Sequence, residues 1–377
     1  MVEPEAGARD HQIFGPGTKR ILALDGGGVR GIISLVYLER VESLLRARAG
    51  RDIRLSEYFH LIGGTSTGSI IATGLALGMS VSELIDVYTR LSKKGFQGSR
   101  WHSGLFVPKF RTKPLMEMIR AHVGDETLGS DALKTGLAIM AKRVDTGSVW
   151  VFHNNPKGVF FSGDGTATYT PNKDLPLAQL IRASTAAPTF FAPERIQVAP
   201  GVEGLFVDGG VSPHNNPALM LFMLATISGY GYRWPTGADK ISLISVGTGF
   251  QPLSSANLPP SWAPSAALAV LGLRSIIEDN VWLTQALMQW MSVSPTPWKI
   301  DGEVGDMAAD RLGPAALLTY ARYDLMLEQA WLENELSTSV SDAALARLRE
   351  IDVPEVAAEL LDLGRAAARM QIKAEHL

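Results

Sequence analysis

The chain has 377 residues and no cysteine, and its 35 Lys and Arg residues against 38 Asp and Glu residues give a formal net charge of −3. This near balance argues against a nucleic-acid-binding protein that depends on a strong basic field. Hydrophobic residues make up 46% of the chain and charged residues 19%, so it can bury a large core and is not mainly disordered. Without cysteine it has no disulfide, thiolate metal site or cysteine nucleophile.

The N-terminal segment 1–18 carries four charged residues, including Arg9 and Asp10, and has no apolar stretch typical of a secretory signal. The longest apolar runs, such as 217–228, fall well short of the roughly 20 residues that a membrane-spanning helix needs. We therefore expect a cytoplasmic protein that can also act as a peripheral protein at the inner membrane surface.

Two strand–turn–helix units follow in chain order. Residues 21–24 predict a strand buried on both faces, and apolar residues spaced by three and four from Ile32 to Leu45 predict a helix. The second unit is predicted as a strand over 58–62, a tight turn and a helix over 69–77. Strands that alternate with helices indicate a mostly parallel sheet covered on both faces. The remaining predictions before residue 250 are strands over 137–141, 149–152 and 241–246, and helices over 81–91, 114–122 and 177–183.

The character of the sequence changes after Gly249. Residues 254–265 are rich in Ser and Pro, and the chain beyond them has a helical pattern. We expect an N-terminal tail over 1–19, a catalytic domain over 20–250 and a helical region over 251–377 packed on that domain. A small separate second domain is the alternative. The predicted helices of this region are 266–278, 280–291, 314–332 and 342–376, the last interrupted near Pro354.

A serine lies between two glycines where the second predicted strand turns into its helix, in Gly64-x-Ser66-x-Gly68. A sharp strand-to-helix turn exposes such a serine, and the glycines let the backbone turn without Cβ clashes. The helix N-terminus behind it favours negative charge nearby. The pattern therefore indicates a nucleophile, and an ordinary glycine-rich turn with a capping residue is the alternative.

A second glycine motif, Gly26-x-Gly28-x-x-Gly31, follows the first predicted strand. It is compatible with a dinucleotide-binding turn, with an oxyanion hole built from backbone amides, or with glycines needed only for close packing. A phosphate-binding P-loop is excluded because Ile32 and Ile33 follow the last glycine in place of Lys and Ser or Thr. The motif alone leaves three interpretations open.

Asp208 ends an apolar run and precedes Gly209 and Gly210. Asp-Gly is common in turns, so this motif alone favours a structural role. A serine nucleophile, however, needs a base, and among the seven histidines only His214 is a serious candidate. If Asp208 is the base directly, its carboxylate must lie within roughly 2.6–3.2 Å of the Ser66 hydroxyl, and low polarity around it must raise its pKa.

Together, in this order, these motifs resemble the patatin-like phospholipase family, and the segment 183–191 resembles a further stretch of that family. The resemblance spans roughly residues 20–250. It implies a three-layer α/β/α fold and hydrolysis of lipid acyl esters by a Ser–Asp dyad. Carried over by residue, it implies Ser66 as nucleophile, Asp208 as proton acceptor and the amides of Gly26, Gly27 and Gly28 as oxyanion hole. The residues that complete the motifs are Arg30, Gly31, Gly64, Gly68, Gly209 and Gly210.

The expected partner is a phospholipid or another acyl lipid, with transient contact to a membrane surface and no nucleic-acid polymer. Residues 93–111 mix cations with aromatic residues and suit anionic head groups, although a loop anchored to the core is the alternative. Arg30 is a candidate for pairing with a lipid phosphate, and a salt bridge to Asp25 is its alternative. Residues 301–306 lack the calcium-loop pattern, and we predict no metal and no cofactor.

Three matters stay open at this level. The helix around 282–291 could line an acyl pocket, and plain core packing is the alternative. Some bacterial relatives of the family resemble this chain in size and are switched on by cyclic nucleotides in antiphage defence, so a small-molecule activator is an alternative. A nucleotide-binding module that uses the first glycine motif is another, and Ser66→Ala would distinguish it from a hydrolase.

Overall fold

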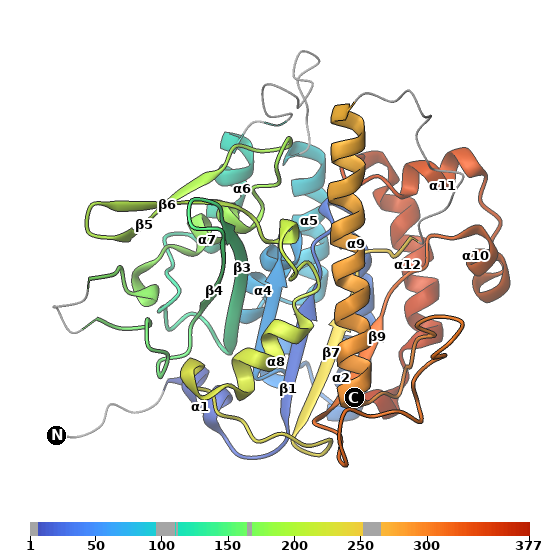
Figure 1. Ribbon diagram of the computed structural model, residues 1–377, viewed down its shortest axis with the longest axis horizontal. Coiled ribbons are helices and arrows are strands. Elements are labelled where there is room, and N and C mark those ends of the chain that lie inside the picture. Colours follow the sequence, from blue (N-terminus) through green and yellow to red (C-terminus); the bar gives the residue numbers. More distant parts are fainter. Residues whose placement is uncertain (1–6, 96–109, 111, 164–167, 252–264) are drawn as a thin grey trace.

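The computed structural model describes residues 7–95, 110, 112–163, 168–251 and 265–377. Within these residues nine strands form one sheet in the order β5-β6-β3-β2-β1-β7-β9-β8, with β4 paired to β3 (Figure 1). The five strands from β3 through β2, β1 and β7 to β9 run parallel, as does β8, and β4 and β6 pair antiparallel with β3. The strands are β1 Lys19–Leu24, β2 Leu61–Thr65, β3 Gly136–Arg143, β4 Ser148–His153, β5 Glu194–Ala199, β6 Val202–Asp208, β7 Ile241–Val246, β8 Ser292–Val293 and β9 Leu318–Tyr323.

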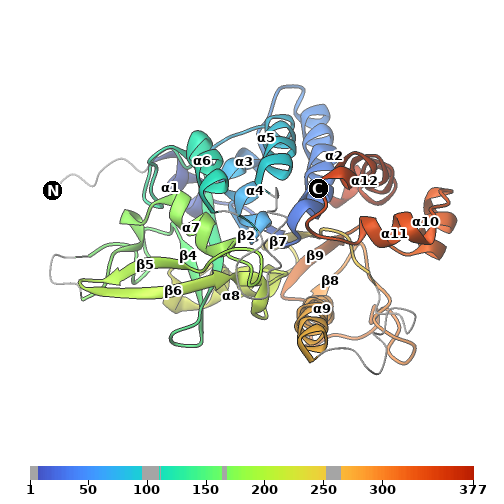
Figure 2. The ribbon, with the colours of Figure 1, turned by 90° about the horizontal axis from the view of Figure 1, so that it is seen from above.

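Helices cover both faces of this sheet. Successive residues of a strand point to opposite faces, and β1 accordingly contributes Leu22 and Leu24 to one apolar core and Ile21 and Ala23 to the other. Seen from above, α2, α4, α5 and α12 lie on one side of the sheet, and α8 and α9 lie on the other (Figure 2). The helices are α1 Ala8–Phe14, α2 Gly31–Ala49, α3 Leu55–Tyr58, α4 Thr67–Ala76, α5 Val81–Gly95, α6 Thr112–Val123, α7 Leu177–Ser184, α8 Ala218–Thr226, α9 Ser265–Met291, α10 Gln329–Leu336, α11 Asp342–Leu348 and α12 Ala357–Gln371.

The structure confirms the predicted α/β/α architecture with a mostly parallel sheet. Its consequence for function lies in where the strands end. The carboxyl ends of β2, β1, β7 and β9 meet at one edge, because parallel neighbours all point the same way. The loops after these strands carry the glycine motifs and the serine motif, so residues far apart in sequence gather at this edge.

Three sequence predictions are wrong. Residues 314–332 were expected to be helical, but they contain β9, whose apolar residues on both faces are buried between the two helical layers and mimic a helix core pattern. Residues 58–62 are not one strand, because Tyr58 ends the short helix α3 and β2 begins at Leu61. The helices expected over 266–278 and 280–291 form one continuous helix, α9, since no glycine or proline interrupts it between them.

The interruption near Pro354 is confirmed, since a turn of 3-10 helix beginning there separates α11 from α12. Beyond residue 250 the chain is not only helical, because β8 and β9 extend the sheet and α12 packs on α2. At the other end, α1 buries Ile13 in the core. The division at residues 19 and 250 stays a prediction, and the strands on both sides of residue 250 share one sheet.

Candidate active site

Ser66 lies on a strained turn between β2 and α4. Its backbone has φ 53° and ψ −127°, a conformation that costs a non-glycine residue free energy and is found mostly at functional sites. The Ser66 amide donates to Ser184 Oγ over 2.9 Å, and that hydroxyl donates in turn to the carbonyl of Met140 over 2.6 Å. A buried serine from α7 therefore holds the turn in place.

The two glycines that flank the serine are required by close backbone approach. A Cβ on Gly64 would lie 2.1 Å from the carbonyl oxygen of Gly68, and a Cβ on Gly68 would lie 2.4 Å from that of Leu24. Backbone cannot move aside as a flexible side chain can, so only glycine fits at either position. The sharp turn that presents Ser66 thus depends on both.

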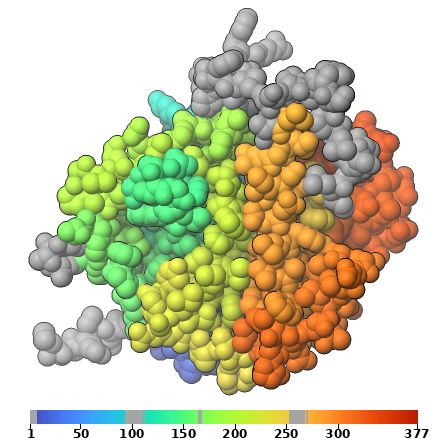
Figure 3. Space-filling model, viewed as in Figure 1, coloured from blue at the N-terminus to red at the C-terminus, as the bar shows by residue number. Residues whose placement is uncertain are grey.

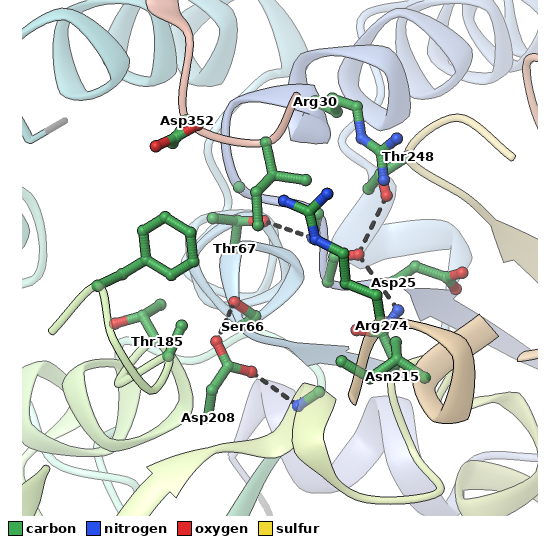
Figure 4. Close-up of a pocket in the computed structure, with 18 of the residues that line it drawn as sticks. Asp25, Arg30, Ser66, Thr67, Thr185, Asp208, Asn215, Thr248, Arg274 and Asp352 are labelled. Atoms are coloured by element: carbon green, nitrogen blue, oxygen red, sulfur yellow. Dashed lines mark hydrogen bonds between the residues drawn. The ribbon is translucent and has the colours of Figure 1, made fainter. Parts of the chain in front are cut away.

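The structure brings Ser66 and Asp208 into direct contact, although 142 positions separate them in sequence. The Ser66 hydroxyl donates to Asp208 Oδ2 over 2.5 Å, and the other carboxylate oxygen, Oδ1, accepts from the amide of Gly210 over 2.7 Å (Figure 4). Asp208 ends β6, which pairs with β3 at Ala141. The sheet register therefore sets the position of the carboxylate beside the serine.

The surroundings of Asp208 make its carboxylate a better proton acceptor. Only 4% of the residue is exposed, and burial raises its pKa to about 6 against the opposing effects of the Ser66 hydrogen bond, the Gly210 amide and the charge of Arg182. Desolvation disfavours the charged form of a carboxyl group. A base whose pKa lies near the working pH is both ionised and able to hold a proton.

The glycine loop Gly26–Gly28 lies directly beside Ser66, because a Cβ on Gly26 would lie 2.9 Å from the Cβ of Ser66. The Gly26 amide is already occupied, because it donates to the carbonyl of Asn215 over 3.2 Å. The Gly27 amide makes only a long hydrogen bond of 3.3 Å to Thr67 Oγ1, and the Gly28 amide donates to none of the described residues. Gly28 has φ +59°, and a Cβ there would lie 2.1 Å from the carbonyl oxygen of Ile351. Within the described residues the Gly28 amide thus has no acceptor, and the Gly27 amide is held only by that long hydrogen bond.

A buried ion network lies behind the glycine loop. Arg322 of β9 forms a two-pronged pair with Asp25, with Nη1 to Oδ1 at 2.9 Å and Nη2 to Oδ2 at 2.8 Å, and Nη2 also reaches Asp324 Oδ2 at 2.9 Å. All three side chains are no more than 4% exposed. Burial raises the pKa of Asp25 to about 6 even beside the guanidinium. No sequence motif indicated Arg322 or Asp324.

These groups line one pocket with a volume of about 270 Å³. The lining combines apolar side chains, among them Ile70, Leu115 and Phe190, with charged ones, among them Arg30 and Glu278. Figure 4 shows Ser66, Asp208 and Thr185 on one side and Arg30, Arg274 and Thr248 on the other. The pocket can therefore hold a molecule with an apolar part and a charged part, with its reacting group beside Ser66.

Comparison with known proteins gives the family. The model of the family described as patatin-like phospholipase matches residues 22–222, which is more than half of the chain. The chain belongs to the patatin-like phospholipase family. The match includes the end of β1, both glycine motifs, Ser66 and Asp208, so the resemblance drawn from the motifs is confirmed.

Individual members of this family are identical to this chain at about a third of the aligned positions. A cGAMP-activated phospholipase of Escherichia coli (strain TW11681) is 35% identical over 205 residues, covering 53% of this chain and 53% of the relative. A cUMP-AMP-activated phospholipase of Escherichia coli is 31% identical over 270 residues, covering 72% of this chain and 76% of the relative. The chain spans about half the length of the first of these relatives.

Among solved structures, human GIVD cytosolic phospholipase A2 aligns with 96% of this chain and 61% of its own, with 12% sequence identity and a TM-score of 0.42. That likeness is too distant to support any statement about the site.

The family motifs contain residues whose predicted partners differ in the structure. Arg30 does not pair with Asp25, because the Asp25 carboxylate pairs with Arg322. Instead, Arg30 Nη1 donates to the backbone carbonyl of Arg349 over 3.2 Å. His214 meets the serine turn through its backbone carbonyl, which accepts from Thr65 Oγ1 over 2.5 Å. The Ser66 hydroxyl donates to the Asp208 carboxylate.

Two further expectations concern the pocket and its mouth. The segment of α9 around residues 282–291 does not line the pocket: Trp282 stacks on Phe250, and α9 contributes instead its earlier turns, over 273–281. Of the segment 93–111, residues 96–109 and 111 lie outside the described residues. The membrane role assigned to it stays a prediction.

Among the described residues, none of the helices combines the length and the apolar character needed to cross a bilayer. The described part of the chain also contains no cluster of three or more His, Asp or Glu residues that could hold a metal ion.

Proposed function

We propose that this chain hydrolyses carboxylic esters of phospholipids or other acyl lipids. Ser66 is the nucleophile, Asp208 the base, and the Gly27 and Gly28 amides the oxyanion donors. The observation that carries the proposal is the 2.5 Å hydrogen bond from a strained, pocket-lining serine to a buried carboxylate. Membership of the patatin-like phospholipase family supports the same chemistry.

The proposed cycle uses only groups that line the pocket. As Ser66 Oγ attacks the ester carbonyl carbon, its proton passes to Asp208, and the carbonyl oxygen becomes an oxyanion that accepts from the Gly27 and Gly28 amides. The proton then leaves on the alcohol or lysolipid as the C–O bond breaks. Water then attacks the acyl-enzyme and gives a proton to Asp208. As the bond from the acyl carbon to Ser66 Oγ breaks, Asp208 passes that proton to Oγ, and the fatty acid leaves.

The pocket also suggests how the substrate is oriented. The apolar side chains of its lining suit an acyl chain, and the cationic Arg30 and Arg274 suit an anionic head group. Arg30 is available for a lipid phosphate, since Asp25 pairs with Arg322. The glycine loop faces the same pocket as Ser66, so we favour its role in an oxyanion hole over a nucleotide-binding module.

The test uses the purified full chain with phospholipid vesicles and mass spectrometry of the lipid products. Wild-type protein should release fatty acid and lysolipid, Ser66→Ala should release none, and Ser82→Ala, which removes an exposed hydroxyl from α5, should act as wild type. Turnover that persists in Ser66→Ala would overturn the proposal.

We propose in addition that a cyclic dinucleotide activates this hydrolysis, because two relatives, 35% and 31% identical, are a cGAMP-activated and a cUMP-AMP-activated phospholipase. The same vesicle assay, run with and without cGAMP and cUMP-AMP, tests it. A rise in Ser66-dependent turnover on adding either nucleotide supports activation. Equal turnover in all three conditions contradicts it.

Membrane-surface contact is proposed through the outer face of α9. This α9 ridge comprises Leu268, Leu273, Ile276 and Leu283, which are 47%, 37%, 58% and 56% exposed, on a helix that lies at the surface of the molecule (Figure 3). Leu273 also lines the pocket, so the ridge continues into the site. Apolar side chains beside a lipid pocket suit insertion between head groups.

The double variant Ile276→Ser with Leu283→Ser should lower the hydrolysis of vesicles several-fold and leave the hydrolysis of a dissolved short-chain ester unchanged, because neither residue lines the pocket. The control is Val202→Ser, which changes an exposed apolar residue of β6. Equal vesicle activity in the double variant and wild type would contradict contact through the α9 ridge.

A further inference from the structure

We propose that Arg322 is a positioning residue for the reaction, because it fixes the Gly26–Gly28 loop from three directions. The inference rests on the proposed function for its catalytic meaning. Arg322 belongs to β9, in the part of the chain beyond the family match, which ends at residue 222. The oxyanion loop thus depends on Arg322, which lies 297 positions from Asp25 in the sequence.

The first connection is direct. Asp25 immediately precedes Gly26, and both of its carboxylate oxygens accept from the Arg322 guanidinium, at 2.9 and 2.8 Å. A two-pronged pair fixes the orientation of a carboxylate as well as its distance. Since Asp25 begins the turn out of β1, fixing its side chain fixes the direction in which the glycine amides leave the strand.

The second connection runs through Asp324. Arg322 Nη2 holds one oxygen of this carboxylate at 2.9 Å, and the other oxygen accepts from the Gly249 amide over 2.7 Å. The neighbouring Thr248 donates its hydroxyl to the carbonyl of Gly26 over 3.0 Å. The loop after β7 is thereby held against the oxyanion loop.

The third connection runs through Ser245. Arg322 Nη1 donates to its hydroxyl over 2.8 Å, and that hydroxyl donates to Asn216 Oδ1 over 3.2 Å. The adjacent Asn215 accepts the Gly26 amide on its carbonyl oxygen, over 3.2 Å. Gly26 is therefore fixed at its nitrogen and its oxygen by loops that meet at one guanidinium.

Burial distinguishes the Arg322–Asp25 pair from other ion pairs that join distant parts of the chain. The Arg322 side chain is 2% exposed, and it serves two carboxylates that line the pocket. The pair of Arg365 with Glu39 also joins the N-terminal and C-terminal parts of the chain, with contacts of 2.8 and 3.2 Å, but both side chains are 39% exposed. The second pair does not line the pocket and provides a matched control.

The test compares Arg322→Lys, Asp25→Asn and Arg365→Lys. Lysine keeps the charge and loses the fork, while asparagine keeps the shape of the aspartate and loses its charge. One measurement is kcat and KM on a dissolved short-chain ester, and the other is backbone amide hydrogen exchange of peptides that cover residues 25–31. The exchange measurement needs no substrate.

For Arg322→Lys and Asp25→Asn we expect kcat to fall about tenfold or more with KM changed less than about twofold, as when a group acts only in the transition state. The 25–31 peptides should exchange faster, and combining the two substitutions should cost little more than either alone. Arg365→Lys should match wild type in both measurements. If Arg322→Lys fails to fold, Asp25→Asn tests the same contact.

Wild-type kcat in both variants, or a lower kcat with unchanged exchange at 25–31, would overturn the inference, because the loop would then not depend on Arg322. Failure of the proposed function has a different signature: wild-type protein would show no turnover that depends on Ser66. The exchange measurement would still report whether Arg322 holds the loop.

Discussion

Two Asp-Gly-Gly turns, one at Asp25 and one at Asp208, line the same pocket. Each aspartate stands at the end of a strand, each is at most 4% exposed, and burial raises the pKa of each to about 6. The two turns nevertheless have different partners. Asp208 accepts from the Ser66 hydroxyl and the Gly210 amide, while both oxygens of Asp25 accept from the Arg322 guanidinium.

The difference teaches that the local sequence of such a turn does not define the role of its carboxylate. A hydroxyl partner leaves a proton that the carboxylate can take during the reaction, so Asp208 suits a base. A guanidinium keeps its protons, so Asp25 has no proton to take from its partner and suits a structural anchor. The partner residue, which lies far away in the sequence, decides between the two roles.

The largest expected effect is a difference in activity loss between substitutions of Asp208 and Asp25. Asp208→Asn should lower kcat by about a thousandfold or more, because the amide cannot accept the serine proton, in line with losses seen when one member of a catalytic pair is removed. Asp25→Asn should lower kcat far less, by about ten- to a hundredfold. Steady-state kinetics on a dissolved ester measures both.

Thermal unfolding of each variant serves as the control for folding. Equal losses of activity in Asp208→Asn and Asp25→Asn, at equal stability, would show that the two carboxylates do not differ in role.

The next effect concerns stability. Arg322→Met leaves two buried carboxylates without their cation and should lower the free energy of unfolding by about 3–5 kcal/mol. Arg365→Met removes a half-exposed pair and should lower it by less than about 1 kcal/mol. Urea unfolding at neutral pH measures the difference. A cost for Arg322→Met no larger than that for Arg365→Met would contradict the anchoring role of Asp25.

The smallest effect is a pH dependence. Asp208 acts as a base only when ionised, and its pKa is raised from the ordinary value of 3.8 to about 6. Activity should therefore rise with pH through a midpoint near 6 and be lost as pH falls below it. The pH profile of kcat/KM on a dissolved ester tests this. Full activity retained down to pH 4.5 would mean that burial does not raise the pKa of the base.

The features of the site that could be predicted from the sequence are those encoded by local motifs. The glycines that flank Ser66 are required by contacts with the backbone of the same turn and of the adjacent strand β1, so their spacing is visible in the chain. The glycines after Asp25 instead approach residues far away in sequence, such as Thr248 and Ile351. The pairing of Ser66 with Asp208 was reachable because both belong to motifs that occur in a fixed order. The 2.5 Å contact is slightly shorter than the roughly 2.6–3.2 Å expected for a direct base and places the two groups within hydrogen-bond reach.

Sequence reasoning did not reach Arg322, Asp324 or the contact of Ile351 with the glycine loop. Arg322 lies in a stretch whose apolar residues on both faces were interpreted as a helix, so the parallel strand that carries it to the pocket was missed. A buried arginine has no sequence signature of its own, because only the tertiary pairing with Asp25 offsets its desolvation. The signal that could have helped was the β-branched and aromatic character of Leu318–Tyr323.

The central claim is that Ser66, paired with Asp208, is the nucleophile. The most direct measurement is peptide mass spectrometry after treatment with a fluorophosphonate, which modifies activated serines. We predict one adduct, on Ser66, in wild type and in Arg365→Lys, and a strongly slowed adduct in Asp208→Asn. An adduct on another serine, or labelling of Ser66 at an equal rate in Asp208→Asn, would contradict the claim.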